Sequence, residues 1–327
     1  MKNTIYKILL FIIQKTSIMV GGQAVIEGVM MRVPGYYATA VRSKESKIMI
    51  DKHRFISLVE KYNLEKIPII RGFCHLIDSM KIGFQSLDWS SKISEDDSTS
   101  NNKFIDFLLS LFSIFFAISL FMGIPYYLTQ LSLNAQSDLF NNSYTFNIIA
   151  GLLRLIIFIL YLYILSHLKD IKRLFAYHGA EHKVVYNFEA GQKLTVNNAK
   201  LFSTKHPRCG TSFVFILMLV TIITYSIIDG LIQYIFNFEF TIFSRISIHL
   251  LFLPIVTGVG YEILKFLARH QNKKIFYLFS KPGLWLQKIT TNEPSDKQLE
   301  VALSALQSAF GDKIKDFQGT VFQADAI

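Results

Sequence analysis

The chain has 327 residues, of which 51% are hydrophobic and 29 are phenylalanine, and its mean hydropathy is +0.34. This composition lies above the norm for soluble domains and indicates a membrane protein. Its formal charge of +10 would suit nucleic acid, but the basic residues flank apolar segments, so anionic lipids are the expected partner and no nucleic acid is expected. Two cysteines without regular spacing, Cys74 and Cys209, argue against a disulfide framework and favour a reducing compartment.

Residues 1–103 are expected to form a cytoplasmic or interfacial region before the first membrane span. Residues 5–20 are apolar, but Lys7, Gln14 and Lys15 leave an uncharged stretch shorter than the roughly 20 residues of a span. We therefore expect an interfacial segment, and the sequence leaves open whether it inserts in the bilayer.

Two motifs follow within this region. Residues 21–32 read GGQAVIEGVMMR, and their glycines predict a glycine-rich turn around Glu27, which is either solvated or a catalytic carboxylate. Residues 37–42 and 48–52 show partial alternation of apolar and polar side chains on either side of a polar turn. This pattern predicts a small β-hairpin.

Residues 69–87 carry apolar side chains at helical spacing, with most charged side chains on the other face. This pattern predicts an amphipathic helix that is cytosolic or lies on the bilayer surface. Residues 90–103 have almost nothing to bury and are expected to form a linker.

Residues 104–268 are expected to form a four-helix transmembrane domain, because four apolar segments approach the length that a bilayer requires. The segments are residues 104–129, 146–165, 213–234 and 246–268. The loop 166–212 is rich in Lys and Arg, whereas 131–145 has one acid and neither Lys nor Arg. The positive-inside rule then places the loop 166–212 and both termini in the cytoplasm.

Residues 269–327 are expected to form a cytoplasmic tail. Ser295 and Gln298 form a capping box, and apolar residues at helical spacing up to Gly311 predict an amphipathic helix that needs a partner surface. The predicted fold is therefore mainly α. It is a polytopic, multi-pass protein of the cell membrane with about four transmembrane helices, amphipathic cytoplasmic helices and a small N-terminal β-hairpin.

The loop 166–212 contains an H-x-x-E-H cluster formed by His178, Glu181 and His182. If helix continues past the second span, the two histidines lie one turn apart on one face, which is the spacing that two ligands of one metal need. The same pattern in inverted zinc proteases uses both histidines as ligands and the glutamate as a base. The alternative is a pair of solvated or capping histidines.

His206 and Cys209 follow in an H-P-R-C turn that the proline is expected to fix at the membrane surface. An imidazole and a thiolate three residues apart favour zinc or a similar divalent metal over magnesium. The alternative, given equal weight, is a surface turn with an inert buried thiol.

Glu262 lies inside the fourth span, where a carboxylate is costly unless it is paired or solvated. It is therefore a third catalytic candidate beside Glu181 and Glu27, and its structural alternative is a pair with Lys265. Asp229 and His249 are expected on the opposite side of the bilayer and were not included in the site.

The motifs together carry a family resemblance. They are GGQAVIEGVMMR, RGFCHLIDSMKIG, YHGAEHKVVYNFEAG, HPRCGTSF and PGLWLQKITTNEPSDKQLEVAL. In this order they resemble the YqhQ-like family of bacterial and plastid membrane proteins of unknown function, some of which are described as predicted metal-dependent enzymes. The resemblance covers nearly the whole chain and implies no established substrate or reaction.

Three functions fit these features. The first is a metal-dependent hydrolase of a lipid-linked or membrane substrate at the cytoplasmic face, with His178, His182 and either His206 or Cys209 as ligands. The second is a non-catalytic assembly or scaffold factor with a structural metal. The third, least favoured, is a transporter. The lipid bilayer is the expected partner, and a second copy of the chain or another membrane protein is left open.

Overall fold

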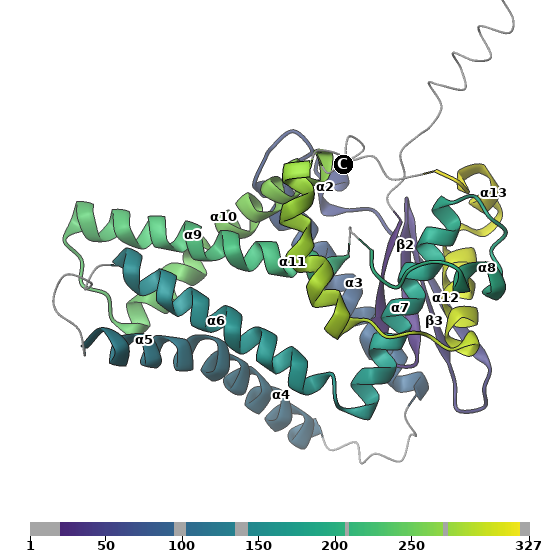
Figure 1. Cartoon of the computed structure of the whole chain (residues 1–327), viewed down its shortest axis with the longest axis horizontal. Helices are drawn as coiled ribbons and strands as arrows, with labels where there is room; N and C mark the ends of the chain where they lie inside the picture. Colours follow the sequence, from purple (N-terminus) through teal and green to yellow (C-terminus); the bar gives the residue numbers. More distant parts are fainter. Residues whose placement is uncertain (1–19, 95–102, 135–142, 207–208, 271–273, 321–327) are drawn as a thin grey trace, which may run out of the picture.

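The computed structural model describes residues 20–94, 103–134, 143–206, 209–270 and 274–320. The molecule has two parts (Figure 1): a small β-sheet covered by helices, and a group of long helices that extends away from the sheet. Helices α3 (Ile70–Ser94) and α11 (Lys274–Thr290) lie between the two parts. The predicted interfacial segment before Val20 and most of the predicted linker lie outside the described residues.

The sheet is an antiparallel meander with the strand order β1-β2-β3-β4. Its strands are β1 (Gly21–Val25), β2 (Gly28–Val33), β3 (Tyr36–Arg42) and β4 (Ile48–Arg54). Strands β3 and β4 pair from Tyr36 with Arg54 to Arg42 with Ile48, which confirms the predicted hairpin as half of a larger sheet.

The predicted glycine-rich turn over residues 21–32 is wrong, because this segment forms β1 and β2. Only the connection at Glu27 is a tight turn, and its φ of 52° lies in the left-handed region that short hairpin connections use. Gly22, by contrast, lies inside a strand and permits a close approach of another segment. Composition alone does not separate these two uses of glycine.

Alternate residues of the strands point to opposite faces of the sheet. One face packs against α7 (Lys169–Glu189) and α12 (Asp296–Phe310) in the larger core. Its strand residues include Val29, Met31, Val33, Ala38 and Ala40. The opposite face contacts α3 in a smaller core of Val25, Met30, Tyr37, Val41 and Ile82. The sheet is therefore covered on both faces by helices that are distant in sequence.

Helix α12 confirms the amphipathic helix predicted in the tail. The side-chain Oε1 of Gln298 accepts a hydrogen bond from the N–H of Ser295 at 2.9 Å, and the helix ends before Gly311. Its apolar face, including Leu299 and Leu306, is fully buried in the larger core. The partner surface that the sequence required is the N-terminal sheet of the same chain.

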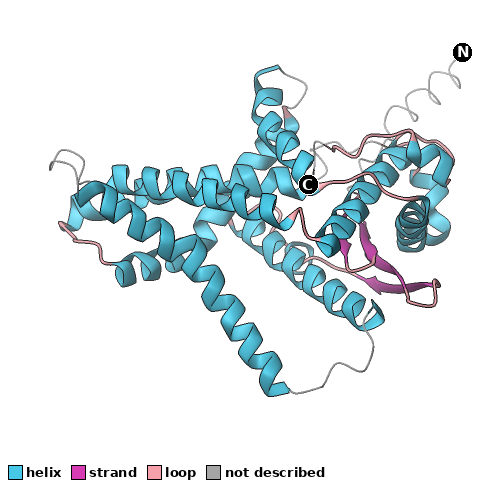
Figure 2. Ribbon diagram, turned by 60° about the horizontal axis from the view of Figure 1, so that its bottom comes forward, coloured by secondary structure: helices cyan, strands magenta, loops and turns pink. Residues whose placement is uncertain are grey.

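The remaining elements are mostly helices of the extended part (Figure 2). They are α2 (Leu58–Lys61), α4 (Lys103–Ile118), the π-helix η1 (Ser119–Gly123), α5 (Ile124–Asn134), α6 (Ser143–Leu165), α8 (Val196–Lys200), α9 (Gly210–Phe236), α10 (Ile242–Arg269), the 3-10 helix η3 (Gly311–Lys313) and α13 (Ile314–Phe317). Among the described residues, four segments are long and apolar enough to cross a membrane. They are Phe107–Ser132, Tyr144–Leu165, Val214–Phe236 and Ile242–Leu267, so each overlaps a predicted span.

The first of these segments runs through α4, η1 and α5 without a break. A π-helical turn leaves carbonyl groups without their usual helical partners. In η1 the carbonyl of Phe121 accepts a hydrogen bond from Nε of Arg154 at 2.7 Å. Arg154 lies near the middle of α6, so the irregular turn provides a partner for a charged side chain inside an apolar segment.

Candidate metal centre

Helix α7 carries the H-x-x-E-H motif. The second span ends at Leu165, and after a short break α7 begins at Lys169, so the motif lies on a separate helix that supplies the required spacing. From Ala176 to Phe188 most of its residues are buried against the sheet and α12. The rings of His178 and His182 lie one turn apart, with centroids separated by 4.5 Å.

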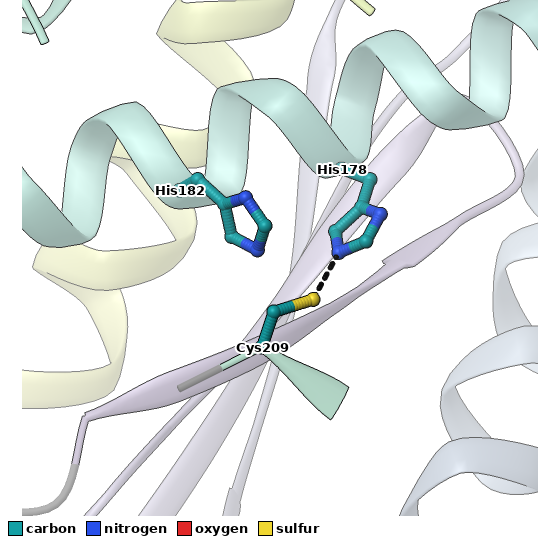
Figure 3. A group of neighbouring side chains, drawn as sticks. All are labelled: His178, His182 and Cys209. Carbon is teal, nitrogen blue, oxygen red and sulfur yellow. Dashed lines mark hydrogen bonds between the residues drawn. The ribbon is translucent and has the colours of Figure 1, made fainter. Parts of the chain in front are cut away.

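Cys209 immediately precedes α9 and lies beside these two rings (Figure 3). Its Sγ is 3.1 Å from Nε2 of His178. One potential ligand atom each from His178, His182 and Cys209 lies within 4.8 Å of the other two. No other such cluster occurs among the described residues. The fold therefore brings Cys209 beside the two histidines of the H-x-x-E-H motif, as the predicted ligand set requires.

Both histidines are oriented by main-chain carbonyl groups. Nδ1 of His178 lies 2.8 Å from the carbonyl oxygen of Thr290, and Nδ1 of His182 lies 2.5 Å from that of Thr204. A carbonyl oxygen only accepts hydrogen bonds, so each Nδ1 must carry a proton and act as the donor. In the neutral rings this leaves the lone pair on Nε2, which is the arrangement seen in histidines that bind metals through Nε2.

Nε2 of His182 is buried and has no hydrogen-bond partner among the described residues. Oε2 of Glu181 lies 3.4 Å from it. An imidazole lone pair and a carboxylate oxygen therefore face each other in a buried place, where an unpaired polar atom costs free energy. A bound cation would stabilise both atoms.

Glu181 itself is 6% exposed and lies between α7 and the first strand. A Cβ atom placed on Gly22 would lie 2.8 Å from Cγ of Glu181, closer than real contacts allow. The same Cβ atom would lie 2.5 Å from the main-chain oxygen of Met30, so Gly22 allows β1 to approach both β2 and this side chain. The glycine-rich motif thus supports the position of the glutamate in the H-x-x-E-H motif.

His206 lies at the edge of the cluster rather than in it. Its ring centroid is 5.6 Å from that of His182 and 4.4 Å from that of Tyr186. Its Nε2 is 3.9 Å from a carboxylate oxygen of Glu189. Gln287 of α11 fixes its main chain, accepting from its N–H and donating to its carbonyl, each at 2.8 Å.

Glu27 is occupied by contacts with the start of α7. Its carboxylate forms an ion pair with Arg173 at 2.5 Å and lies 3.5 Å from the hydroxyl oxygen of Tyr177. Burial, reinforced by the Glu27 carboxylate, raises the pKa of Tyr177 above its usual value. Glu27 therefore holds the β1–β2 turn on α7 and is not in the metal-ligand cluster.

Glu262 pairs with Arg71 of α3, which lies 191 residues earlier in the chain. Two hydrogen bonds of 2.6 and 2.5 Å join the guanidinium to the carboxylate in a bidentate contact. The structural alternative proposed from the sequence was a pair with Lys265 or a snorkelling side chain, and the hydrogen-bonded partner in the structure is Arg71. This pair fixes α3 on α10.

Sequence reasoning missed the groups that orient the cluster. The carbonyls of Thr204 and Thr290 carry no signal, because every residue has a carbonyl. Gln287 is fully buried, but its residue type is as common on surfaces as in such a position. Pro207 and Arg208 of the predicted turn lie outside the described residues.

Comparisons with known proteins place the site in a family without assigned chemistry. Residues 67–312 match a family model described as "Protein of unknown function (DUF1385)". The chain is also 32% identical over 304 residues to "Uncharacterized protein YqhQ" of Bacillus subtilis (strain 168), which covers 87% of this chain and 90% of the relative. No solved structure matches the chain.

Proposed function

The chain belongs to the DUF1385 family, and from this premise we propose that it is a membrane-embedded, metal-dependent hydrolase whose ion is held by His178, His182 and Cys209. One observation carries the proposal. Both imidazoles donate from Nδ1 to main-chain carbonyls, while Nε2 of His182 is buried without a hydrogen-bond partner. This combination leaves two oriented nitrogen lone pairs beside a thiol.

The donor set fits zinc or a similar divalent ion. Tetrahedral zinc with nitrogen at about 2.0 Å and sulfur at about 2.3 Å separates neighbouring ligand atoms by about 3.3–3.6 Å. The three ligand atoms here lie 3.1 to at most 4.8 Å apart, so small side-chain shifts suffice. A zinc ion with three protein ligands supplies Lewis acidity at an open fourth position.

Glu181 is the residue of this chain best placed to hold or accept a proton beside the ion. Its Oε2 lies 3.4 Å from Nε2 of His182, and Gly22 keeps β1 packed against it. A buried carboxylate at this distance can serve as a general base or become a fourth ligand. Glu27 and Glu262 are less suited to the role, because each is engaged by an arginine.

We place the reaction at the cytoplasmic membrane face. The segment between the second and third spans carries most of the loop Lys and Arg residues, which favours the cytoplasm by the positive-inside rule. Cys209 lies at the start of the third span-bearing helix, so the ion would sit close to the end of that span. A lipid-linked or membrane-protein substrate suits this depth.

A second candidate is a structural metal in a non-catalytic scaffold factor. It is favoured because the groups around the site come from different helices. Cys209 directly precedes α9, and the carbonyl that orients His178 belongs to Thr290, the last residue of α11. An ion bound here would tie α7 to both helices. With Glu181 as a fourth ligand the site would be closed to substrate.

The two candidates differ in whether a small molecule can reach the ion. We would purify the full chain in detergent, replace the ion with Co²⁺, record the visible spectrum and titrate with azide. An open site changes its spectrum on adding azide, whereas a closed four-ligand site does not. Glu181→Gln should keep the cobalt spectrum if Glu181 is a base and lose it if Glu181 is a ligand. Absence of any cobalt spectrum in the unmodified protein would exclude both candidates.

A further inference from the structure

A second polar region lies on the other face of the sheet. A half-open cavity of about 290 Å³ is lined by residues of β1, β2, α3 and α10. Its polar lining side chains are Gln23, Arg32, His75, Ser79 and Tyr261. A neighbouring hollow of about 530 Å³ shares Arg32 and His75 with it, so these two side chains lie where the hollows meet.

The polar groups of this cavity are not used inside the protein. No hydrogen bond joins any of the five side chains to another described residue. The guanidinium of Arg32 lies over the ring of Phe55 at 4.5 Å, and the ring of His75 stacks on that of Tyr261 at 5.1 Å. Donors from β1, β2, α3 and α10 therefore converge on one space without protein acceptors.

The charges around the cavity favour an anion. Burial lowers the pKa of Arg32, and the charge of nearby Asp78 opposes this shift without forming an ion pair among the described residues. Burial, together with the charges of Arg32, Lys265 and Arg71, lowers the pKa of His75 to about 4, so this ring is neutral at pH 7. Nearby Asp78 accepts a hydrogen bond from the N–H of Leu58, and Glu262 is engaged by Arg71. Arg32 is thus a partly buried cation without an ion pair among the described residues.

The cavity also lies at the boundary between apolar and polar regions. Tyr261 is six residues before Leu267, where the fourth apolar segment ends, which corresponds to about 9 Å of helix. Helix α3 turns small and polar residues towards the sheet. Its outer face exposes an apolar stripe formed by Ile77, Met80, Phe84 and Leu87. A helix of this kind lies in the interface of a bilayer, at the level of lipid phosphates.

We propose that this cavity binds a phosphate group, with Arg32 as its main contact. The phosphate is carried either by an anionic phospholipid or by a free phosphate ester. A guanidinium pairs with phosphate through two parallel hydrogen bonds. The tetrahedral arrangement of phosphate oxygens lets Ser79, Gln23 and Tyr261 donate from other directions, which a planar carboxylate would not satisfy. This inference does not depend on the metal centre.

Thermal unfolding of the full chain in maltoside detergent tests the proposal. The melting temperature is measured without ligand, with glycerol 3-phosphate, and with micelles containing phosphatidylglycerol, for the unmodified protein and Arg32→Gln. Lys47→Gln is the matched control, because Lys47 is 73% exposed, does not line the cavity and, within the described part of the chain, pairs only with Glu45. Arg32→Gln should bind about tenfold more weakly or worse, from the loss of a charged hydrogen-bond pair.

Comparison of the two ligands identifies the source of the phosphate. Stabilisation by glycerol 3-phosphate supports a free ester, and stabilisation by phosphatidylglycerol alone supports a lipid head group. If Arg32→Gln does not fold, Arg32→Lys keeps the charge and should still show weaker stabilisation. The proposal is overturned if neither ligand raises the melting temperature of the unmodified protein, or if the arginine variants respond as strongly as Lys47→Gln.

Discussion

Two buried polar clusters in this protein differ in how their hydrogen-bonding groups are used. In the cluster between the spans, the carboxylate of Asp229 is fully buried and accepts hydrogen bonds from Asn147 at 2.9 Å and Arg245 at 3.0 Å. His249 approaches the same carboxylate at 3.1 Å. The Nε of Arg245 has no hydrogen bond among the described residues, but the guanidinium lies over two phenylalanine rings.

The cluster of His178, His182 and Cys209 is different, because its Nδ1 atoms are satisfied and one Nε2 is not. The Asp229 cluster has its charges paired within the protein, as expected for a group that holds α6, α9 and α10 together. In the histidine cluster, main-chain carbonyls orient both rings through Nδ1, whereas Nε2 of His182 has no hydrogen-bond partner among the described residues. A buried polar cluster therefore points to a ligand when its orienting bonds are complete and its inward atoms are unpaired.

The largest expected effect comes from breaking the Asp229 cluster. Asp229→Ala leaves Arg245 buried without its carboxylate and should lower the free energy of unfolding by about 3–5 kcal/mol. The control is Asp88→Ala, because Asp88 is 64% exposed and its ion-pair partner among the described residues is Lys92 on the same helix. The loss should be the same with and without added zinc in chemical denaturation. A loss that zinc abolishes would contradict the distinction between the clusters.

A smaller effect is expected from a substitution at Gly179, where α7 contacts the main chain that follows α11. A Cβ atom on Gly179 would lie 2.1 Å from the carbonyl oxygen of Asn292, so Gly179→Ala should push α7 away and cost about 1–3 kcal/mol. The same shift should weaken metal affinity, because Thr290 orients His178.

Gly123→Ala is the matched control for this substitution, because it is also in a helix and has nothing within 4 Å of its added Cβ. It should not lower the denaturation midpoint, because alanine favours helix more than glycine does, and it should leave the zinc affinity unchanged. Equal zinc affinity in the Gly179→Ala and Gly123→Ala proteins would show that the helix contact does not position the ligands.

A third effect depends on pH and concerns His75, whose pKa is lowered from 6.5 to about 4, mainly by burial. Between these values the unfolded chain binds more protons than the folded one, so stability falls as pH drops from 6.5 towards 4. His75→Phe keeps a ring against Tyr261 and should flatten this part of the melting-temperature profile. Profiles of equal slope below pH 6.5 would show that His75 does not contribute.

The sequence predicted those parts of the fold that local patterns encode. The apolar spans and helix α12 depend on the length and period of apolar runs, and both are read directly from consecutive residues. The sheet was only half predicted, because glycines inside β1 resemble a loop in composition. Helix α12 near the C-terminus packs on β2 and β3 near the N-terminus, and no local pattern indicates this long-range contact.

The candidate site was likewise predicted only in the part that a local pattern encodes. The spacing of His178 and His182 on a helix could be predicted, because i and i+4 residues share a face in any helix. The meeting with Cys209, rather than with Glu27 or Glu262, depends on the tertiary fold, which brings the residue before α9 beside α7. The pairing of Glu262 with Arg71 likewise joins segments 191 residues apart.

The account depends most on whether the histidine cluster binds a metal ion. The direct measurement is the metal content of the purified full-length protein by mass spectrometry, for the unmodified chain, His182→Ala and His167→Ala. His167 is the control because its Nδ1 also faces a main-chain carbonyl, at 2.8 Å, but its ring is exposed in the turn after α6. We predict about one zinc-like ion per chain in the unmodified protein and in His167→Ala, and almost none in His182→Ala, since loss of one ligand of a small site destroys tight binding. Metal-free unmodified protein, or equal metal content in all three proteins, would contradict the account.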